Sequence, residues 1–112
     1  EDTYAPPDLI KHSPGVAKAW VKYNAVTGPA IYSGISYNIN SITDEGTGDF
    51  TITIETDFSG ANYVAVATCS NNCYMHNDAA TPTAGAIRLQ GRSDGGTATD
   101  TVHTYVAFFG DQ

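Results

Sequence analysis

Residues 37–58 read YNINSITDEGTGDFTITIETDF, and this stretch decides the fold class. Two runs in which apolar and polar side chains alternate flank the polar segment 44–49, and such alternation places side chains on opposite faces of a strand. Gly46 and Gly48 can adopt the positive φ angles that a chain reversal needs. The stretch therefore predicts a β-hairpin whose turn lies at 44–49.

Other strand-like segments lie on both sides of the hairpin. Gly, Thr, Ser, Asn and Tyr are abundant and the strongest helix formers are scarce, which favours strands and turns. The run at 62–68 is more continuously apolar, and this predicts a central strand covered on both faces. The remaining strand-like segments are 16–24, 30–42, 86–92 and 101–109.

About seven short strands without a helix predict an all-β fold, a single antiparallel β-sandwich of jelly-roll-like type. We expect this domain over residues 16–112. Residues 1–15 carry three prolines and no periodicity, so we expect an extended lead-in or linker there. The chain begins with Glu1 and its only methionine is Met75, which indicates a piece or a processed product of a longer protein.

The charge balance excludes some partners. The chain has 112 residues, of which 5 are basic and 12 acidic, and its net charge is −7. Such a chain lacks the basic surface that binds nucleic acid or anionic membranes. It also has no apolar run near the roughly 20 residues that cross a bilayer. We expect neither a nucleic-acid partner nor membrane insertion.

Cys69 and Cys73 stand close together in the segment CSNNC. A local disulfide across a turn and two free thiols are both compatible with this spacing. With His76 they offer three ligands for zinc, whereas a structural zinc site takes four. We therefore expect no metal here, and no family signature marks either cysteine as a nucleophile.

The turn at 44–49 contains Asp44, Glu45 and Asp49. Oxygen-rich turns can bind calcium, but the spacing does not follow the twelve-residue EF-hand loop. We expect both aspartates to accept backbone N–H bonds within the turn. Glycoside hydrolysis needs two carboxylates about 5–10 Å apart across a cleft, and nothing singles out such a pair. The prediction is a protein that is not an enzyme and has no cofactor.

The first and last strands offer candidates for a subunit contact. In 16–24 the alternation puts Trp20 on one face with Lys18 and Lys22, while Ala19 and its alternates form the core face. Trp20 is thus expected on a surface or at an interface. In the closing strand 101–109, the residues on one face are expected at the core or a subunit contact: His103, Tyr105 and Phe109.

Two segments offer candidates for ligand contact. Residues 69–85 predict a long polar loop, and loops of that length are often functional. Its asparagine amides can donate to and accept from sugar hydroxyls, and its tyrosine ring can stack on a sugar face. The second segment is the flexible loop 93–99. The candidates are Asn71, Asn72, Tyr74 and Asn77 in the first loop and Asp94 in the second.

Arg88, Gln90 and Arg92 stand on one face of the strand 86–92. This stripe is either a solvated outer face or a surface that pairs with carboxylates across a subunit boundary or on an acidic glycan. Arginine suits the second role, since its planar fork can bind a carboxylate through two hydrogen bonds. Arg88 and Arg92 are therefore candidate ligand-binding residues.

Four segments, in their amino-acid sequence and in their order, resemble the C-terminal domains of tail-fibre and tailspike proteins of tailed bacteriophages. The most specific are GVAKAWVKYN at 15–24 and YNINSITDEGTGDFTITI at 37–54. ANYVAV at 61–66 and FFGD at 108–111 follow in the same order. The resemblance covers roughly residues 14–111.

The resemblance implies a virion module at the tip of a fibre or spike, assembled in the host cytoplasm, usually as a homotrimer. Such tips bind a glycan or protein on the host surface, and the resemblance implies no catalytic residues. We expect receptor binding by the loops, with three copies adding avidity. The alternative is a purely structural virion module, either a trimerisation or capping domain or a capsid decoration protein, without a host ligand.

Overall fold

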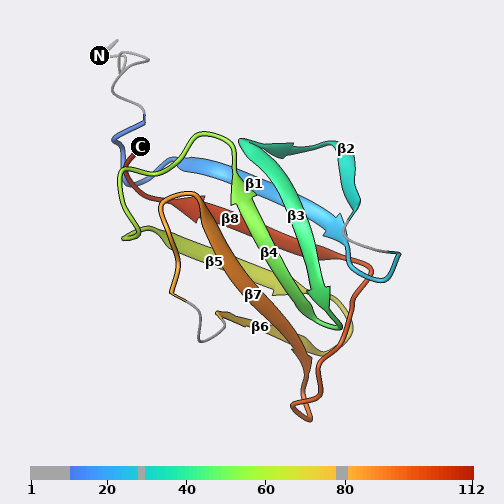
Figure 1. Ribbon diagram of the computed structural model, residues 1–112. Coiled ribbons are helices and arrows are strands. Elements are labelled where there is room, and N and C mark those ends of the chain that lie inside the picture. Colours follow the sequence, from blue (N-terminus) through green and yellow to red (C-terminus); the bar gives the residue numbers. More distant parts are fainter. Residues whose placement is uncertain (1–10, 28–29, 78–80) are drawn as a thin grey trace, which may run out of the picture.

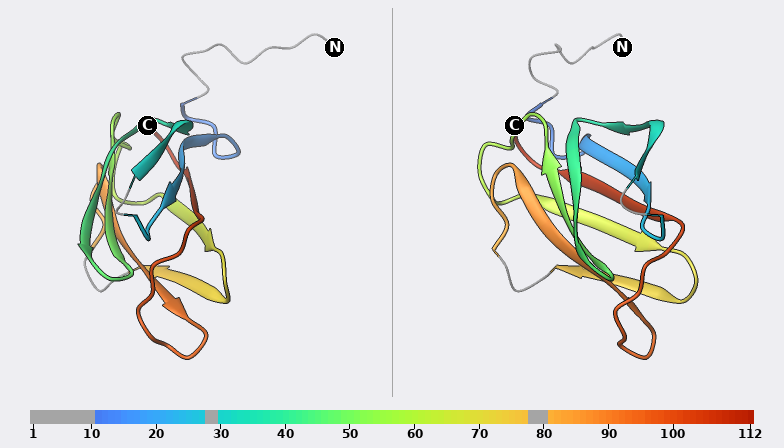
Figure 2. Two further views of the ribbon diagram at one scale, coloured as in Figure 1. Left: turned by 90° about the vertical axis from the view of Figure 1, so that its right-hand side faces the viewer. Right: turned by 45° about the vertical axis from the view of Figure 1, so that its right-hand side comes forward.

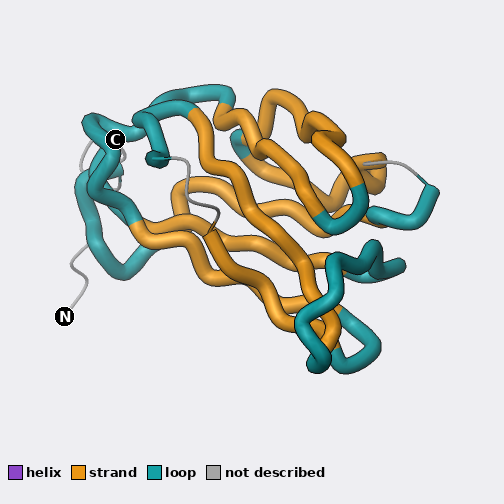
Figure 3. Tube along the Cα trace, turned by 60° about the horizontal axis from the view of Figure 1, so that its bottom comes forward, coloured by secondary structure: helices purple, strands orange, loops and turns teal. Residues whose placement is uncertain are grey.

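The computed structural model describes residues 11–27, 30–77 and 81–112, and in this part of the chain every regular element is a strand (Figure 3). The strands are β1 (Ala17–Asn24), β2 (Ala30–Tyr37), β3 (Ile39–Gly46), β4 (Asp49–Ile54), β5 (Val64–Cys69), β6 (Cys73–Asn77), β7 (Ala86–Ser93) and β8 (Thr104–Phe109).

Two four-stranded sheets pack face to face (Figures 1 and 2). Their orders are β2-β1-β8-β5 and β3-β4-β7-β6, and all neighbouring strands are antiparallel. We call them the first and the second sheet. The expected all-β class with two antiparallel sheets is confirmed.

The predicted hairpin is present as β3 and β4. Ile42 lies opposite Ile52, and the strands meet at a turn in which Gly46 and Gly48 have φ angles of 142° and 64°. In β4, Phe50, Ile52 and Ile54 are buried. The alternation read from the sequence therefore places one face of this hairpin in the core.

The core lies between the sheets. Tyr23 of β1 meets Phe50 of β4 edge to face, with ring centroids 5.5 Å apart. Phe58 stacks on Tyr63 at 4.5 Å, and both belong to the same apolar cluster. The buried apolar residues are Ala19, Val21, Tyr23, Ala25, Ile42, Phe50, Ile52, Ile54, Phe58, Ile87, Leu89, Val106 and Phe108.

The strand expected at 62–68 is not central. β5 is the edge strand of the first sheet, and Val64 and Val66 are 58% and 54% exposed. Its inner residues Ala65 and Ala67 pack against the core, while its outer side chains have no covering layer among the described residues. An apolar run predicts that a strand face is covered, either by the same chain or by another molecule. Periodicity alone does not distinguish these two cases.

The prediction of a loop at 69–85 is wrong for the first half of that segment. β6 occupies Cys73–Asn77 and pairs with β7, so the chain passes from the first sheet to the second within a few residues. Cys69 and Cys73 form a disulfide with Cα atoms 5.7 Å apart, which decides between the two redox states that the sequence left open. The disulfide joins the end of β5 to the start of β6.

Lys18 was expected on the outer face and is instead buried, with 3% of its surface exposed. The register between β1 and β8 shifts between Ala17 and Ala19, which inserts Lys18 as an extra residue and breaks the alternation. Its ammonium donates to the carbonyl oxygens of Ser13, Val16 and Gly110. We call these contacts the Lys18 clamp.

The two ends of the described chain lie together (Figure 1). The Gln112 N–H donates to the Lys11 carbonyl at 3.0 Å, and His12 pairs with the Asp111 carboxylate. The turns after β3, β5 and β7 gather at the opposite end of the sandwich, which we call the distal end (Figure 2). Residues 11–15 of the expected lead-in are thus tied to the domain, and residues 1–10 lie outside the described part.

Candidate functional site

An apolar outer face covers the first sheet. Tyr37, Trp20, Ala107 and Val66 form one row across its four strands. Phe109 and Val64 form a second row at one end, and Tyr105 lies beside Lys22 and Thr68 towards the other. We call this surface, together with Ile35, the apolar face.

The apolar face is open and hollowed. Tyr37 is 57% exposed, Trp20 39% and Tyr105 42%. A hollow of about 420 Å³ lies between Trp20, Ile35, Val66 and Tyr105. The Lys22 ammonium sits 5.5 Å from the centre of the Tyr105 ring, so even the charged residue contributes its stem to this surface.

The residues predicted for a subunit contact fall largely on this face. Trp20, Tyr105 and Phe109 share it. His103 was expected on the same strand face, but β8 begins at Thr104, so His103 precedes the strand. Its ring stacks on Tyr105 with centroids 6.4 Å apart, and its Nδ1 is buried without a hydrogen-bond partner. The structure thus places His103 at the border of the apolar face.

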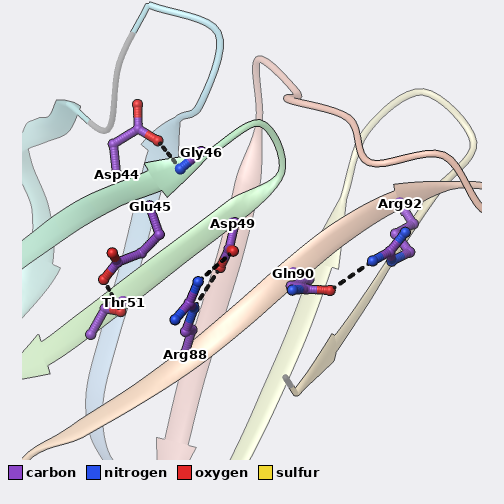
Figure 4. A network of polar contacts seen from close by, with 8 residues as sticks. All are labelled: Asp44, Glu45, Gly46, Asp49, Thr51, Arg88, Gln90 and Arg92. Atoms are coloured by element: carbon purple, nitrogen blue, oxygen red, sulfur yellow. Dashed lines mark hydrogen bonds and ion pairs between the residues drawn. The ribbon is translucent and has the colours of Figure 1, made fainter. Parts of the chain in front are cut away.

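The outer face of the second sheet is polar. Arg88 Nε and Nη2 donate to the two carboxylate oxygens of Asp49 at 2.9 and 2.7 Å (Figure 4). The hydrogen bond from Arg88 lowers the pKa of Asp49 below its ordinary value of 3.8. Asp49 was expected to accept a backbone N–H within its turn, and this prediction is wrong because Arg88 of the neighbouring strand holds its carboxylate.

The Asp49–Arg88 pair predicts a pH dependence. A carboxylate whose folded pKa is depressed contributes stability above its unfolded pKa of about 3.8, and that contribution is lost as the pH falls through the lower, folded value. We expect acid unfolding of the Asp49→Asn variant to show a smaller loss of unfolding free energy below pH 4 than the wild type. Urea titrations between pH 2.5 and 6 measure this, and identical slopes in both proteins would contradict it.

Arg92 is held on the same face by neutral groups. Its Nε donates to His76 Nε2 at 3.1 Å, and one terminal nitrogen donates to the Gly96 carbonyl at 3.0 Å. The other terminal nitrogen donates to Gln90 Oε1 at 3.0 Å (Figure 4). Tyr74 lies directly across the strand pair from Arg92 and is 46% exposed. We call Tyr74, His76, Gln90 and Arg92 the Arg92 cluster.

The other predicted ligand residues lie apart from the Arg92 cluster. Asn71 and Asn72 form the turn between β5 and β6 with φ angles of 66° and 54°, a conformation that asparagine tolerates well. The Asp94 N–H donates to the Asn72 carbonyl, so the two loops meet at the distal end. Asn77 lies at the end of β6 on the side of Met75, facing the inter-sheet opening. The candidates therefore divide between the distal end, the inter-sheet opening and the polar outer face of the second sheet, which we call the polar face.

The loop at 93–99, expected to be flexible, is a turn held by hydrogen bonds. Ser93 N–H donates to the Thr97 carbonyl and Thr99 N–H to the Gly91 carbonyl. The Asp100 carboxylate accepts the Gly48 N–H at 2.6 Å, so this loop also holds the hairpin turn. The distal end is thus one connected structure.

Sequence reasoning placed Gln90 in the stripe with the two arginines but missed His76 as a contact of Arg92. His76 was considered as a zinc ligand beside the cysteines, but the disulfide occupies both sulfur atoms. The signal that could have found it is the alternation of Tyr74 and His76 in a short strand facing the alternation of Gln90 and Arg92.

The described residues contain no group of three or more His, Cys, Asp or Glu side chains arranged to hold a metal ion. In the hairpin turn, Asp44 accepts the Gly46 N–H at 2.9 Å, as predicted. Glu45 accepts a hydrogen bond from the Thr51 hydroxyl at 2.6 Å (Figure 4). These carboxylates therefore serve the turn and its strands.

Comparison of this chain with protein-family models, curated proteins and solved structures gives no match. In the described ranges, no helix has the length and apolarity needed to cross a membrane.

Proposed function

We propose that this domain is the receptor-binding tip of a phage tail fibre or tailspike, which acts on the virion as a homotrimer and binds a host-surface glycan without catalysis. The resemblance of residues 14–111 to such tips supports this proposal. The two-sheet architecture is compatible with the jelly-roll-like sandwich that the proposal includes. The distal end and the polar face are the surfaces available to the receptor.

The observation that carries the proposal is the apolar face. Val64, Val66 and Tyr37 are each more than half exposed on it. Contiguous apolar surface of this kind on a soluble domain marks an interaction site. Three copies that pack their apolar faces towards a common axis would bury it, because a cyclic trimer can place the same surface of each subunit at its centre.

The receptor would meet the surfaces that the trimer leaves outside. The chain ends lie together at the end opposite the distal turns, so a stalk attached through residue 11 leaves Asn71, Asn72 and Asp94 facing away from it (Figure 1). Arg92 and Tyr74 lie on the sheet opposite the apolar face. Polar and aromatic groups of this kind are those that contact sugars.

The Val66→Lys variant tests the assembly. Val66 is 54% exposed, so the variant keeps the core, whereas a charge at its position would have to be desolvated in the trimer. We expect a trimer for the wild type and a monomer for the variant by light scattering coupled to size exclusion. Thr43→Lys, which adds the same charge to an exposed site on the other sheet, should remain trimeric. A monomeric wild type at high concentration would contradict the proposal.

Adsorption of the purified domain to host cells tests receptor binding. We expect the domain to bind susceptible cells and to compete with phage adsorption. A trimer that neither binds nor competes would favour the structural virion module, in which the same apolar face serves only trimerisation or capping. Release of reducing ends from host polysaccharide would overturn the non-enzymatic part of the proposal.

A further inference from the structure

The Arg92 cluster carries an inference about the chemistry of the receptor, which rests on the proposed function. We propose that Arg92 and Tyr74 bind a carboxylate-bearing sugar, with the guanidinium on the carboxylate and the ring against the sugar face. His76 and Gln90 are positioning residues that hold the guanidinium in place.

Arg92 forms no ion pair with a carboxylate among the described residues, and its charge acts on Asp49 only from a distance, where it helps to lower the pKa of that carboxyl. Its guanidinium donates to an imidazole, a backbone carbonyl and an amide oxygen. Among the described residues, no carboxylate oxygen lies within 4.0 Å of its guanidinium nitrogens. Arg88, four residues earlier on the same face of β7, is instead held by both oxygens of Asp49. Of these two arginines, Arg92 is the one whose charge remains available to an anionic ligand.

The guanidinium is also held in a fixed position. His76 Nδ1 lies 3.1 Å from the Asn77 carbonyl, and because a carbonyl only accepts, Nδ1 carries the proton. His76 Nε2 is therefore the acceptor for Arg92 Nε. Three neutral contacts on three sides reduce the side-chain freedom that ligand binding would otherwise have to remove. A guanidinium still has unused N–H groups after these three bonds, since it offers five donors.

Tyr74 supplies the second half of the site. It lies opposite Arg92 in the antiparallel pair of β6 and β7, where side chains of one face are neighbours. Its ring is 6.0 Å from that of His76 and is 46% exposed. An exposed ring beside a fixed cation matches a ligand with one flat apolar face and one planar anionic group, which an acidic hexose provides.

The net charge of the chain limits where an anionic glycan can bind. At −7 the protein as a whole repels anions, so a polyanionic glycan would be bound only where a local cation overcomes that repulsion. The contact is charge-assisted and exposed, and we expect it to weaken as the ionic strength rises. Neutral glycans that lack the carboxylate would gain nothing from Arg92.

The test uses the 112-residue chain and three small probes: glucuronate, glucose and glucose 6-phosphate. ¹H–¹⁵N spectra record the Arg92 Nε–H and the Tyr74 amide during each titration. We expect saturable shifts of both signals with glucuronate, at least tenfold weaker apparent binding in Arg92→Gln, and no saturable shifts with glucose. Lys11→Gln makes the same charge change at an exposed site beside the chain ends and should bind as the wild type does.

Each other outcome overturns the assignment. Equal or stronger shifts with glucose 6-phosphate would reject a site for sugar carboxylates, and so would glucuronate shifts that persist in Arg92→Gln. Spectral dispersion outside the cluster shows whether Arg92→Gln is folded. If that variant does not fold, Arg92→Lys is used instead, because lysine keeps the positive charge but cannot form the two parallel hydrogen bonds of a guanidinium. A domain that adsorbs to host cells but ignores glucuronate would refute the acidic-sugar site and leave the proposed function standing.

Discussion

Replacing Gly48 with alanine is expected to lower the free energy of unfolding by roughly 2–5 kcal/mol. Gly48 has a φ of +64°, which costs an L-residue about 1–2 kcal/mol. A Cβ there would lie 2.4 Å from the Gly91 carbonyl oxygen and 2.7 Å from the Thr99 nitrogen. Both are backbone atoms that cannot turn aside as a side chain would, and overpacking of this kind typically costs about 1–3 kcal/mol.

Urea unfolding at a fixed protein concentration measures this effect, because the proposed trimer would make the stability depend on concentration. Gly15→Ala is the matched control, since a Cβ at Gly15 has no neighbour within 4 Å. We expect the control to change stability by no more than about 0.5 kcal/mol. Equal midpoints for the two variants would show that the hairpin turn does not pack against the loop before β8.

Lys18→Met is expected to be nearly as damaging, with a loss of roughly 3 kcal/mol or more. The methionine keeps most of the side-chain volume but leaves three carbonyl oxygens without the Lys18 donor, and an unsatisfied buried group typically costs about 1–3 kcal/mol. We expect the loss of stability to be greatest at the chain ends, because the clamp joins Ser13 and Val16 to Gly110.

Hydrogen exchange and limited proteolysis can locate that loss. We expect faster exchange and cleavage between residues 11 and 16 in Lys18→Met, together with a lower urea midpoint. Lys11→Met removes an exposed lysine whose ammonium is not part of the clamp, and it should leave both readouts unchanged. If Lys18→Met matched this control, the buried ammonium would contribute nothing to stability.

The strength of the sequence prediction lay in local patterns. Alternation in residues 50–55 and the glycines of the preceding turn, Gly46 and Gly48, determine a hairpin through contacts between near neighbours, so the sequence alone predicted β3 and β4. The apolar run at 62–68 was identified as a strand but assigned to the wrong place in its sheet. Its place depends on β8, which lies about 40 residues further along the chain.

The bulge at Lys18 shows the same limit on a smaller scale. Strict alternation predicts that Lys18 and Trp20 share a face, and the extra residue inserted opposite β8 removes that relation. No local pattern in residues 16–24 predicts the bulge. The carbonyl oxygens that receive the ammonium come in part from Gly110, at the far end of the chain.

The candidate sites could be predicted only in part for related reasons. Trp20 and Tyr105 were chosen from their strand faces, and the sheet brings them together through a register that preserves those faces. The sequence could not predict that Arg88 pairs with a carboxylate while Arg92 contacts an imidazole, because this depends on which side chains the neighbouring strands supply. Asp49 comes from β4 and His76 from β6, and only the strand order of the second sheet places each beside its arginine.

The position of β1 has a mechanical consequence. β1 lies inside the first sheet, with β2 on one side and β8 on the other, and the Lys18 clamp stands at its start. If residue 11 is pulled while the distal end is held, the force acts along β1. The hydrogen bonds of β1 to β2 and β8 would then be sheared at the same time and would not break one after another. A domain built in this way resists extension from the residue 11 side most strongly when tension is applied along the strand axis.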